Sequence, residues 1–423
     1  MAKKEFVKLS IGEEATVGTS AAVTARVPIT DVSVLAEDVS KSETGIIVGR
    51  RTEAGSTLDS VGYSQEIPSV LTANKANWML FKSLMGVRGT PVPCVGSIMV
   101  RYTGSEESCI LTIAADKITA KAGALGSESE VTGFSISLAG TIASIISSIN
   151  AVEGFKAQRT NGADTASATG ACHPVSAQAA GAAVPIPLKG ATSKAYCTVF
   201  TPNYGEGENN TVSLLTEGVG DNVLAVGCAV NTMSLSAELK GKATLSYSMV
   251  GLKKQIGQGA SGLAYSESDL NPMKFNDGLT YIDGVQFSYI KSQSLEVNNN
   301  IADDEGWEQG TLYKSEHAQG KFQASGSITL KLTPADVEAS SEKLSRKVAS
   351  DEESALVLEY KGCAIDTGLE EECIFQMPKV QYTSGSKSAG TNWLQQELNF
   401  SAVDDAELVG DVLTIYMIGK VSG

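Results

Sequence analysis

The chain has 423 residues, which is long enough for two or three domains with substantial cores. Its formal net charge of −15 at pH 7 argues against a surface that grips nucleic acid, because a protein of this sign repels the phosphate backbone. Only 6% of the residues are aromatic, whereas 42 are glycine, and Val, Thr and Ser are frequent. This mixture is typical of many short strands joined by turns.

The seven cysteines are scattered and include no CxxC pair, so the sequence predicts reduced thiols and neither a zinc site nor a disulfide framework. The basic start MAKKEFVKLS is not followed by an apolar stretch, so we expect no secretory signal. No window approaches the roughly 20 apolar residues that a membrane helix needs. We therefore expect a soluble protein made in the cytoplasm, without membrane anchoring.

The chain opens with an alternating apolar pattern at residues 26–35, where Pro28 indicates an edge strand or a kink. The following residues, 37–60, are polar and include Arg50 and Arg51, so we expect a long loop there.

A strand at residues 61–72 and a helix at residues 74–86 come next, and Gly86 is the expected C-terminal cap of the helix. After a long intervening segment, further strands are expected at residues 195–201, 211–215, 230–237 and 243–251.

The intervening segment, residues 87–192, contains a complete set of elements of its own. Its expected helix is capped by Thr141, carries isoleucines at helical spacing and ends at Gly154. Residues 161–183 are rich in Ala, Gly, Ser and Thr and are predicted to be an exposed loop. Its expected strands are at residues 98–102, 109–114 and 117–121. These elements predict a small inserted α+β domain.

The second half begins with a strand at residues 285–297, followed by a polar stretch at residues 298–319. In the next strand, residues 320–333, apolar side chains from Phe322 to Leu332 occupy every second position, as in a half-buried antiparallel strand. Thr333 and Pro334 are a good start signal for a helix. The last expected strands are at residues 355–360, 372–383 and 393–403.

Both halves thus place the same kinds of element in the same order, which predicts a duplicated β-rich unit. We assign residues 1–92 with 191–253 to a discontinuous first domain, residues 93–190 to the insertion and residues 254–423 to a second domain. A chain that repeats such a unit without a catalytic constellation is more consistent with assembly than with catalysis.

Candidate chemical sites are weak. The only histidines, His173 and His317, have no carboxylate or cysteine at ligand spacing, and His317 is predicted to be a solvated loop residue. The glycine cluster at residues 257–262 lacks the GK[ST] of a phosphate loop. Asp303, Asp304 and Glu305 could bind a hard cation, but a solvated acidic turn is the favoured interpretation. We predict no catalytic, cofactor or metal site.

Several segments resemble the tail tube proteins of long-tailed bacteriophages. These are VPITDVSV at residues 27–34 with the helix that ends in LMG, GCAVNTMSLSAELKGKATLSYSMVG at residues 227–251, and SQSLEVNNNI at residues 292–301. The strongest similarity is in IFQMPKVQYTSGS and NWLQQELNFSAV within residues 374–403. The resemblance covers nearly everything outside the insertion, which looks like a decorating module.

The resemblance implies a mainly β fold of two tandem antiparallel β-sandwich or barrel domains, each flanked by one helix. It implies self-association into rings that stack as a virion tail tube, with tape measure and tail-tip or terminator proteins as partners. DNA would pass through the lumen without specific binding. Because tube rings present six tube domains and this chain holds two, three chains would form a ring with pseudo-sixfold symmetry, and a ring of six chains is the alternative.

We assign the polar stretches 37–60 and 298–319 to contacts between subunits and rings. The expected contact residues are Asp38, Arg50, Arg51, Asn298, Asn299, Asp303, Asp304 and Trp307. The alternative functions are another ring-forming tail component, such as a terminator, a baseplate ring or the tube of a contractile system, or a secreted β-sandwich adhesin.

Overall fold

The computed structural model describes residues 7–31, 35–43, 56–106, 108–124, 126–179, 184–191, 194–203, 210–218, 221–302, 305–331, 348, 353–389, 394–404 and 411–420. The fold is mainly β, with antiparallel strand pairing throughout the described residues, so the predicted fold class is confirmed. The helices are α1 (Lys75–Met85), α2 (Ile142–Asn150) and the short α3 (Glu267–Leu270). No helix in this part of the chain is long and apolar enough to span a membrane.

The central feature is one continuous run of antiparallel strands, here called the central sheet. Its order is β3 (Ala36–Glu43), β4 (Ser56–Val70), β18 (Thr244–Gly251), β17 (Val223–Glu238), β22 (Ile290–Asn298), β23 (Gln323–Lys331), β26 (Leu394–Ala402) and β25 (Leu369–Ala389). The strands before β22 come from the first half of the chain and the others from the second. The pairing of β17 with β22 therefore joins the two halves into one sheet.

The two halves repeat the same strand pairings. The further strands of the first half are β1 (Lys8–Glu13), β2 (Ala25–Val27), β16 (Val212–Glu217) and β19 (Lys253–Ile256). Those of the second half are β20 (Lys274–Ile282), β21 (Val285–Phe287), β24 (Ser354–Asp366) and β27 (Thr414–Gly419). In the first half β1 pairs with β2 and β16, and β17 pairs with β16, β18 and β19. In the second half β20 pairs with β21 and β24, and β25 pairs with β24, β26 and β27. The duplicated order expected from the sequence is therefore a duplicated topology.

The long strands β17 and β25 each belong to two sheets. The first part of β17 pairs with β16 and β19, and its last part runs through the central sheet. Gly227 lies in this strand at φ +67°, and a Cβ there would come within 2.7 Å of Leu252 Cδ1. Glycine is thus required where the strand leaves one sheet for the other, because other residues rarely adopt this backbone conformation.

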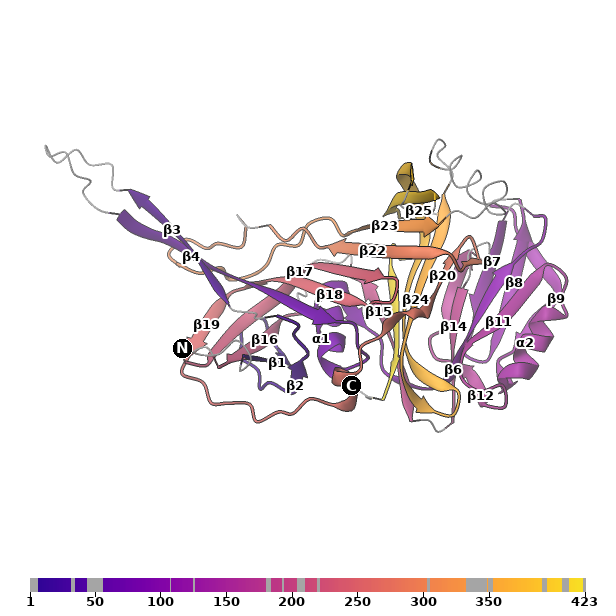
Figure 1. Cartoon of the computed structure of the whole chain (residues 1–423), viewed down its shortest axis with the longest axis horizontal. Coiled ribbons are helices and arrows are strands. Elements are labelled where there is room, and N and C mark those ends of the chain that lie inside the picture. Colours follow the sequence, from indigo (N-terminus) through magenta and orange to yellow (C-terminus); the bar gives the residue numbers. More distant parts are fainter. Residues whose placement is uncertain are drawn as a thin grey trace, which may run out of the picture.

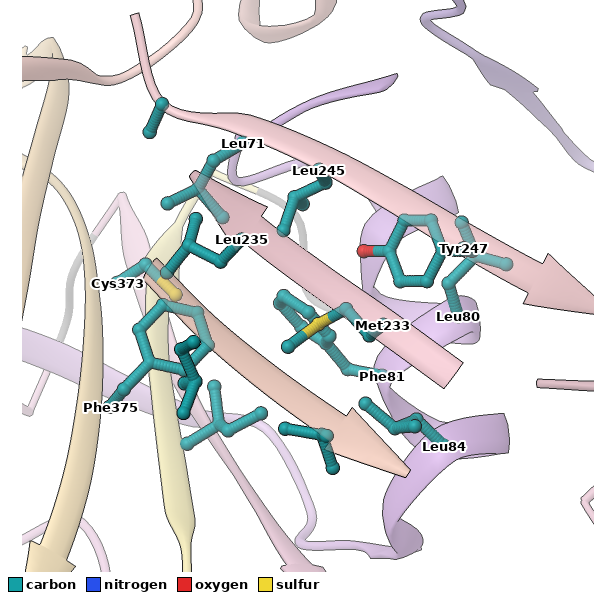
Figure 2. Packing of buried hydrophobic residues seen from close by; sticks show 14 of the residues in the cluster. Leu71, Leu80, Phe81, Leu84, Met233, Leu235, Leu245, Tyr247, Cys373 and Phe375 are labelled. Carbon is teal, nitrogen blue, oxygen red and sulfur yellow. The ribbon is translucent and has the colours of Figure 1, made fainter. Parts of the chain in front are cut away.

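Helix α1 packs on one face of the central sheet and forms the main core with it (Figure 2). The Asn74 side chain accepts a hydrogen bond from Asn77 N at the start of the helix, and Gly86 ends it as predicted. Phe81 points from the helix toward the sheet, and its ring centroid lies 6.4 Å from that of Tyr247 and 6.1 Å from that of Phe375. Since Tyr247 and Phe375 belong to different repeats, α1 connects both halves through one core.

The inserted segment has a hydrophobic core of its own. Thr141 caps α2 by accepting a hydrogen bond from Ser144 N, in agreement with the sequence. One sheet contains β13 (Val175–Ala179), β7 (Ser108–Ile113), β8 (Lys117–Gly123) and β9 (Ser129–Ser137). The other strands of this region are β6 (Val92–Tyr102), β10 (Ala139–Thr141), β11 (Phe155–Asn161), β12 (Ser167–Ala171) and β14 (Val184–Lys189). Finally, β6 and the short β5 (Gly86–Arg88) both pair with β15 (Ala195–Pro202), which pairs with β27.

Three expectations from the sequence need correction. Residues 37–43 and 56–60, expected to be part of a loop, belong to the paired strands β3 and β4, which project from the end of the molecule opposite the insertion (Figure 1). Residues 161–183 include strands β12 and β13, because their backbones form hydrogen bonds with the distant strands β10, β14 and β7, which local composition does not indicate. His317 is buried and not solvated. The helix predicted from Pro334 lies outside the described residues.

We expect Phe81→Ala to lower the free energy of unfolding by about 3–5 kcal/mol, because it removes a buried ring from the core shared by both repeats. Urea denaturation of the purified chain would measure the change. Leu270→Ala is the control, since Leu270 is 68% exposed. Equal losses in the two variants would contradict a shared core centred on Phe81.

Candidate functional site

The face of the central sheet opposite α1 is polar, and we call it the polar face. Strand β17 shows the alternation: Met233 and Leu235 are buried against α1, whereas Ser234, Ser236 and Glu238 are exposed on the other side. Successive side chains of a strand point to opposite faces, so the polar residues of all paired strands gather on one surface.

The polar face continues across both repeats without a break. Registered neighbours share it, as when Ser234 pairs with Ser246 on one side and with Glu296 on the other. Ser294 and Ser327 join hydroxyl groups at 2.9 Å. Its members are Ser64, Glu66, Ser234, Ser236, Glu238, Ser246, Ser248, Ser294, Glu296, Ser325, Ser327, Thr329, Ser384, Ser386, Ser388, Glu397 and Asn399. A surface made mainly of hydroxyls, amides and carboxylates is hydrated and offers little apolar area to a passing polymer.

The charge of the polar face is mainly negative. Exposed carboxylates at Glu66, Glu238, Glu296 and Glu397 are distributed from β4 to β26. Positive charge is confined to one end, where Lys291 donates to Gln395 at 2.9 Å and Lys331 pairs with the same residue. The face therefore repels phosphate over most of its area.

The central sheet ends in two edges that no described strand covers. At one end β3 pairs only with β4, and at the other the segment of β25 from Gln381 to Ala389 pairs only with β26. An uncovered edge exposes backbone donors and acceptors and is a template for pairing with another chain.

The predicted contact residues lie at different places. Asp38 lies in β3, where it is registered with Gly62. The side chain of Asn298 accepts from Asn300 N, and the ring of Trp307 lies 5.7 Å from Lys314 Nζ. Arg50, Arg51, Asp303 and Asp304 lie outside the described residues.

Asn299 has a role within the chain. Its buried side-chain amide donates to Leu84 O at 2.8 Å and to Val230 O at 3.0 Å. It thereby ties the residue that follows β22 to the end of α1 and to β17. Its use as a contact between subunits stays a prediction.

The two histidines lie apart, each beside a backbone carbonyl. His317 Nε2 donates to Gly227 O at 2.7 Å, and burial lowers the pKa of its imidazole. His173 Nε2 lies 3.4 Å from Cys197 O, and burial again lowers its pKa. Among the described residues no three His, Cys, Asp or Glu side chains gather as a metal site.

A buried polar cluster attaches the insertion to the second repeat. Glu372 of β25 accepts from Ser97 Oγ at 2.8 Å, and Asn161 Nδ2 donates to Glu370 O at 2.8 Å. Glu359 of β24 is also buried, and Lys361 Nζ lies 3.3 Å from a Glu359 oxygen. The insertion thus emerges from the first repeat but docks on the second.

Burial raises the pKa of the Glu359 carboxyl well above its usual value of 4.5, and the charge of Glu372 raises it further. Burial also raises the pKa of Glu372, although its hydrogen bond with Ser97 opposes this. Both shifts are upward, so each carboxyl group binds its proton more tightly than an exposed glutamate does, and Lys361 offsets part of the negative charge of the pair. A proton in this position allows the two carboxyl groups to share a buried site.

The chain matches the family model described as phage tail tube protein over residues 7–402, which span the strands from β1 to β26 and the insertion. It therefore belongs to the phage tail tube protein family, which is a family of structural proteins and not of enzymes. Membership implies a virion component that assembles into a tube. A comparison with curated proteins finds no match.

The sequence did not predict the polar face or the two edges, although it carries a signal for both. The alternation of serine with apolar residues in MSLSAE and LSYSMV marks strands with one wet face. The segment TSGSKSA in β25 has small polar residues on both faces, which is typical of an edge.

We expect the free energy of unfolding to fall as pH rises above about 4.5, because the folded state binds a proton at Glu359 that the unfolded chain releases. Each unit by which the folded pKa exceeds the unfolded one contributes about 1.4 kcal/mol to this loss. Glu359→Gln should reduce the slope, measured by urea denaturation between pH 5 and 8. The exposed Glu153→Gln is the control, and equal slopes in all three proteins would refute the protonated pair.

Proposed function

We propose that this chain forms rings that stack into the hollow tail tube through which phage DNA is ejected. The observation that supports it best is the central sheet, which has one buried face, one hydrated acidic face and two uncovered edges. Such a sheet can extend sideways from copy to copy and curve into a wall.

In this proposal the polar face lines the channel. DNA that passes a tube must not adhere to it, and a wall made mainly of hydroxyls and carboxylates has few basic groups for the phosphates and little apolar area for the bases. The lysines at one end of the face would form part of a rim.

We further propose that the ring contains three chains with pseudo-sixfold symmetry, since each chain supplies two topologically equivalent repeats. In this proposal the first tube domain comprises residues 1–92 and 191–253, and the second comprises residues 254–423. The inserted domain, residues 93–190, packs on the side of the second repeat away from the polar face and decorates the outer surface.

The β3–β4 hairpin and the segment between β22 and β23 occupy equivalent places in the two repeats. The strands β3 and β4 pair with each other in the first repeat, as β22 and β23 do in the second. We assign both to contacts with the neighbouring ring, with Asp38, Arg50, Arg51, Asn298, Asn299, Asp303, Asp304 and Trp307 as candidate residues. Tape measure and tail-tip or terminator proteins are the other proposed partners, and synthesis takes place in the host cytoplasm.

Negative-stain electron microscopy of the purified chain over a concentration series tests the proposal directly. We expect hollow tubes whose end-on averages show three outer lobes, one for each inserted domain. Six lobes would reject the trimer and leave the tube. A chain that stays monomeric at every concentration, even with tail extract as nucleus, would overturn the assignment.

We expect Glu296→Lys combined with Glu397→Lys to make assembled tubes retain short duplex DNA at low salt, because the acidic channel wall becomes basic. Co-sedimentation of labelled DNA with tubes would measure retention, which should fall steeply as salt rises. Glu130→Lys with Glu153→Lys places the same charges on the insertion and is the control. Equal retention by both variants would remove these glutamates from the channel.

A further inference from the structure

The junction between the repeats shows how the sheet of one repeat pairs with the sheet of the next. Strand β17 at the end of the first repeat pairs with β22 of the second, with Thr232 opposite Asn298, Ser234 opposite Glu296 and Leu235 opposite Leu295. This junction has well-defined register and buried side chains on its core face.

The strands equivalent to β17 and β22 have uncovered edges at the two ends of the central sheet. Strand β25 is the counterpart of β17, since each is a long corner strand with an irregularity in its hairpin, between Val230 and Thr232 in one and between Tyr382 and Ser384 in the other. Strand β3 is the counterpart of β22, since β3 pairs with β4 at the outer side of the first repeat as β22 pairs with β23 at the outer side of the second.

From this correspondence we propose that β25 of one copy pairs with β3 of a second copy, antiparallel and in the register of the β17–β22 junction. Ser234 and Ser386 are equivalent positions in the two repeats, because each lies at the same distance after the irregularity in its hairpin. Following the pairings outward from these two residues, through β18 and β4 in one repeat and through β26 and β23 in the other, makes Ala36 of β3 equivalent to Glu296 of β22. Ser386 of one copy then faces Ala36 of the next, and Ser384 faces Asp38. The inference rests on the proposed ring and specifies its interface.

The charges along the two edges support a second copy of this chain as the partner. In the proposed register Lys387 faces Leu35, and Glu37 lies on the same side one pair further along. Lys387 and Glu37 are diagonal neighbours in reach of each other. Glu37 already forms an ion pair with Lys254 of its own chain, so Lys387 would add a second cation to it. In the internal junction the equivalent positions are the apolar Leu235 and Val297.

The replacement of apolar residues by Lys387 and Glu37 has a physical reason. The core face of the internal junction, with Leu235, Leu295 and Val297, is buried within the chain, whereas both faces of the outer edges are exposed until a second copy arrives. Charged and small polar residues keep such an edge soluble and oppose pairing out of register. The edge therefore favours one partner, a second copy of this chain.

A cysteine pair tests the register in the full chain. Residues directly opposite in an antiparallel pair have Cβ atoms about 4.5–5.5 Å apart, close enough for a disulfide after slight adjustment. We expect Ser386→Cys with Ala36→Cys, under mild oxidation with copper phenanthroline, to give covalent dimers and closed trimers on a denaturing gel, lost on reduction. Ser386→Cys with Ser40→Cys is the control, because Ser40 lies on the same face four residues out of register. The parent chain controls for its seven cysteines, of which only Cys363 is not buried.

The outcomes separate the interface from the function. Tubes in the micrographs without a cross-link in the first pair would overturn the interface and leave the tail tube. Equal cross-linking in both pairs would refute the register. Absence of any tube or ring from the parent chain would refute the proposed function itself.

A charge reversal gives a second measurement that needs no cross-link. We expect Lys387→Glu to raise the concentration at half-assembly roughly threefold, because it places like charges beside Glu37. Lys117→Glu makes the same change at an exposed position of the insertion and should leave assembly unchanged. Light scattering over a dilution series would measure both, and an unchanged Lys387→Glu protein would contradict the predicted contact.

Discussion

Hydrogen bonding between neighbouring strand backbones is the constraint on which the rest of this structure depends. Each strand of the central sheet satisfies its backbone by pairing on both sides, and the chain achieves this internally from β4 to β26. Only β3 and the last part of β25 lack a second neighbour among the described strands. A duplicated sheet that ends in two complementary edges can satisfy them by repetition, and repetition with a constant twist gives a ring.

The two faces of the sheet then have separate tasks. One face is filled by α1 and by side chains from both repeats, so that Phe81 contacts Tyr247 of the first and Phe375 of the second. The other face carries serine, threonine and glutamate in strict alternation with these buried residues. A single period-2 pattern thus provides both the stability of the subunit and the proposed surface of the channel.

Features that depend on local sequence could be predicted, and features that depend on distant pairing could not. The alternation from Phe322 to Leu332 locates β23, and Thr141 and Gly86 mark helix ends that the structure shows. Strand β3 and residues 56–60 of β4 were expected to be part of a loop, because these residues are mostly polar and lack the alternation that identifies a strand. His317 was expected to be solvated, since nothing local shows that its segment covers Gly227 of a strand 90 residues away.

The polar face shares this limitation, because its members come from strands that meet only in the fold. Ser234 and Glu296 are neighbours through the β17–β22 pairing, which no local pattern encodes. The duplication was visible in the order of elements, yet the uncovered edges became evident only when the pairings of the two repeats were compared.

A ring closes only when the angle between successive repeats is held constant, and several contacts fix this angle within the chain. Strand β15 of the first repeat pairs with β27 of the second, and the insertion that leaves the first repeat is hydrogen-bonded to Glu370 and Glu372 of the second. These contacts lie away from the polar face and brace the β17–β22 junction from the outside. No covalent linker spans the junction between copies, so in the proposed ring its angle must come from edge register and from contacts of the neighbouring surfaces. The internal junction can therefore be rigid and apolar, whereas the external one must form reversibly from soluble chains, which is the difference that Lys387 and Glu37 introduce in place of Leu235 and Val297.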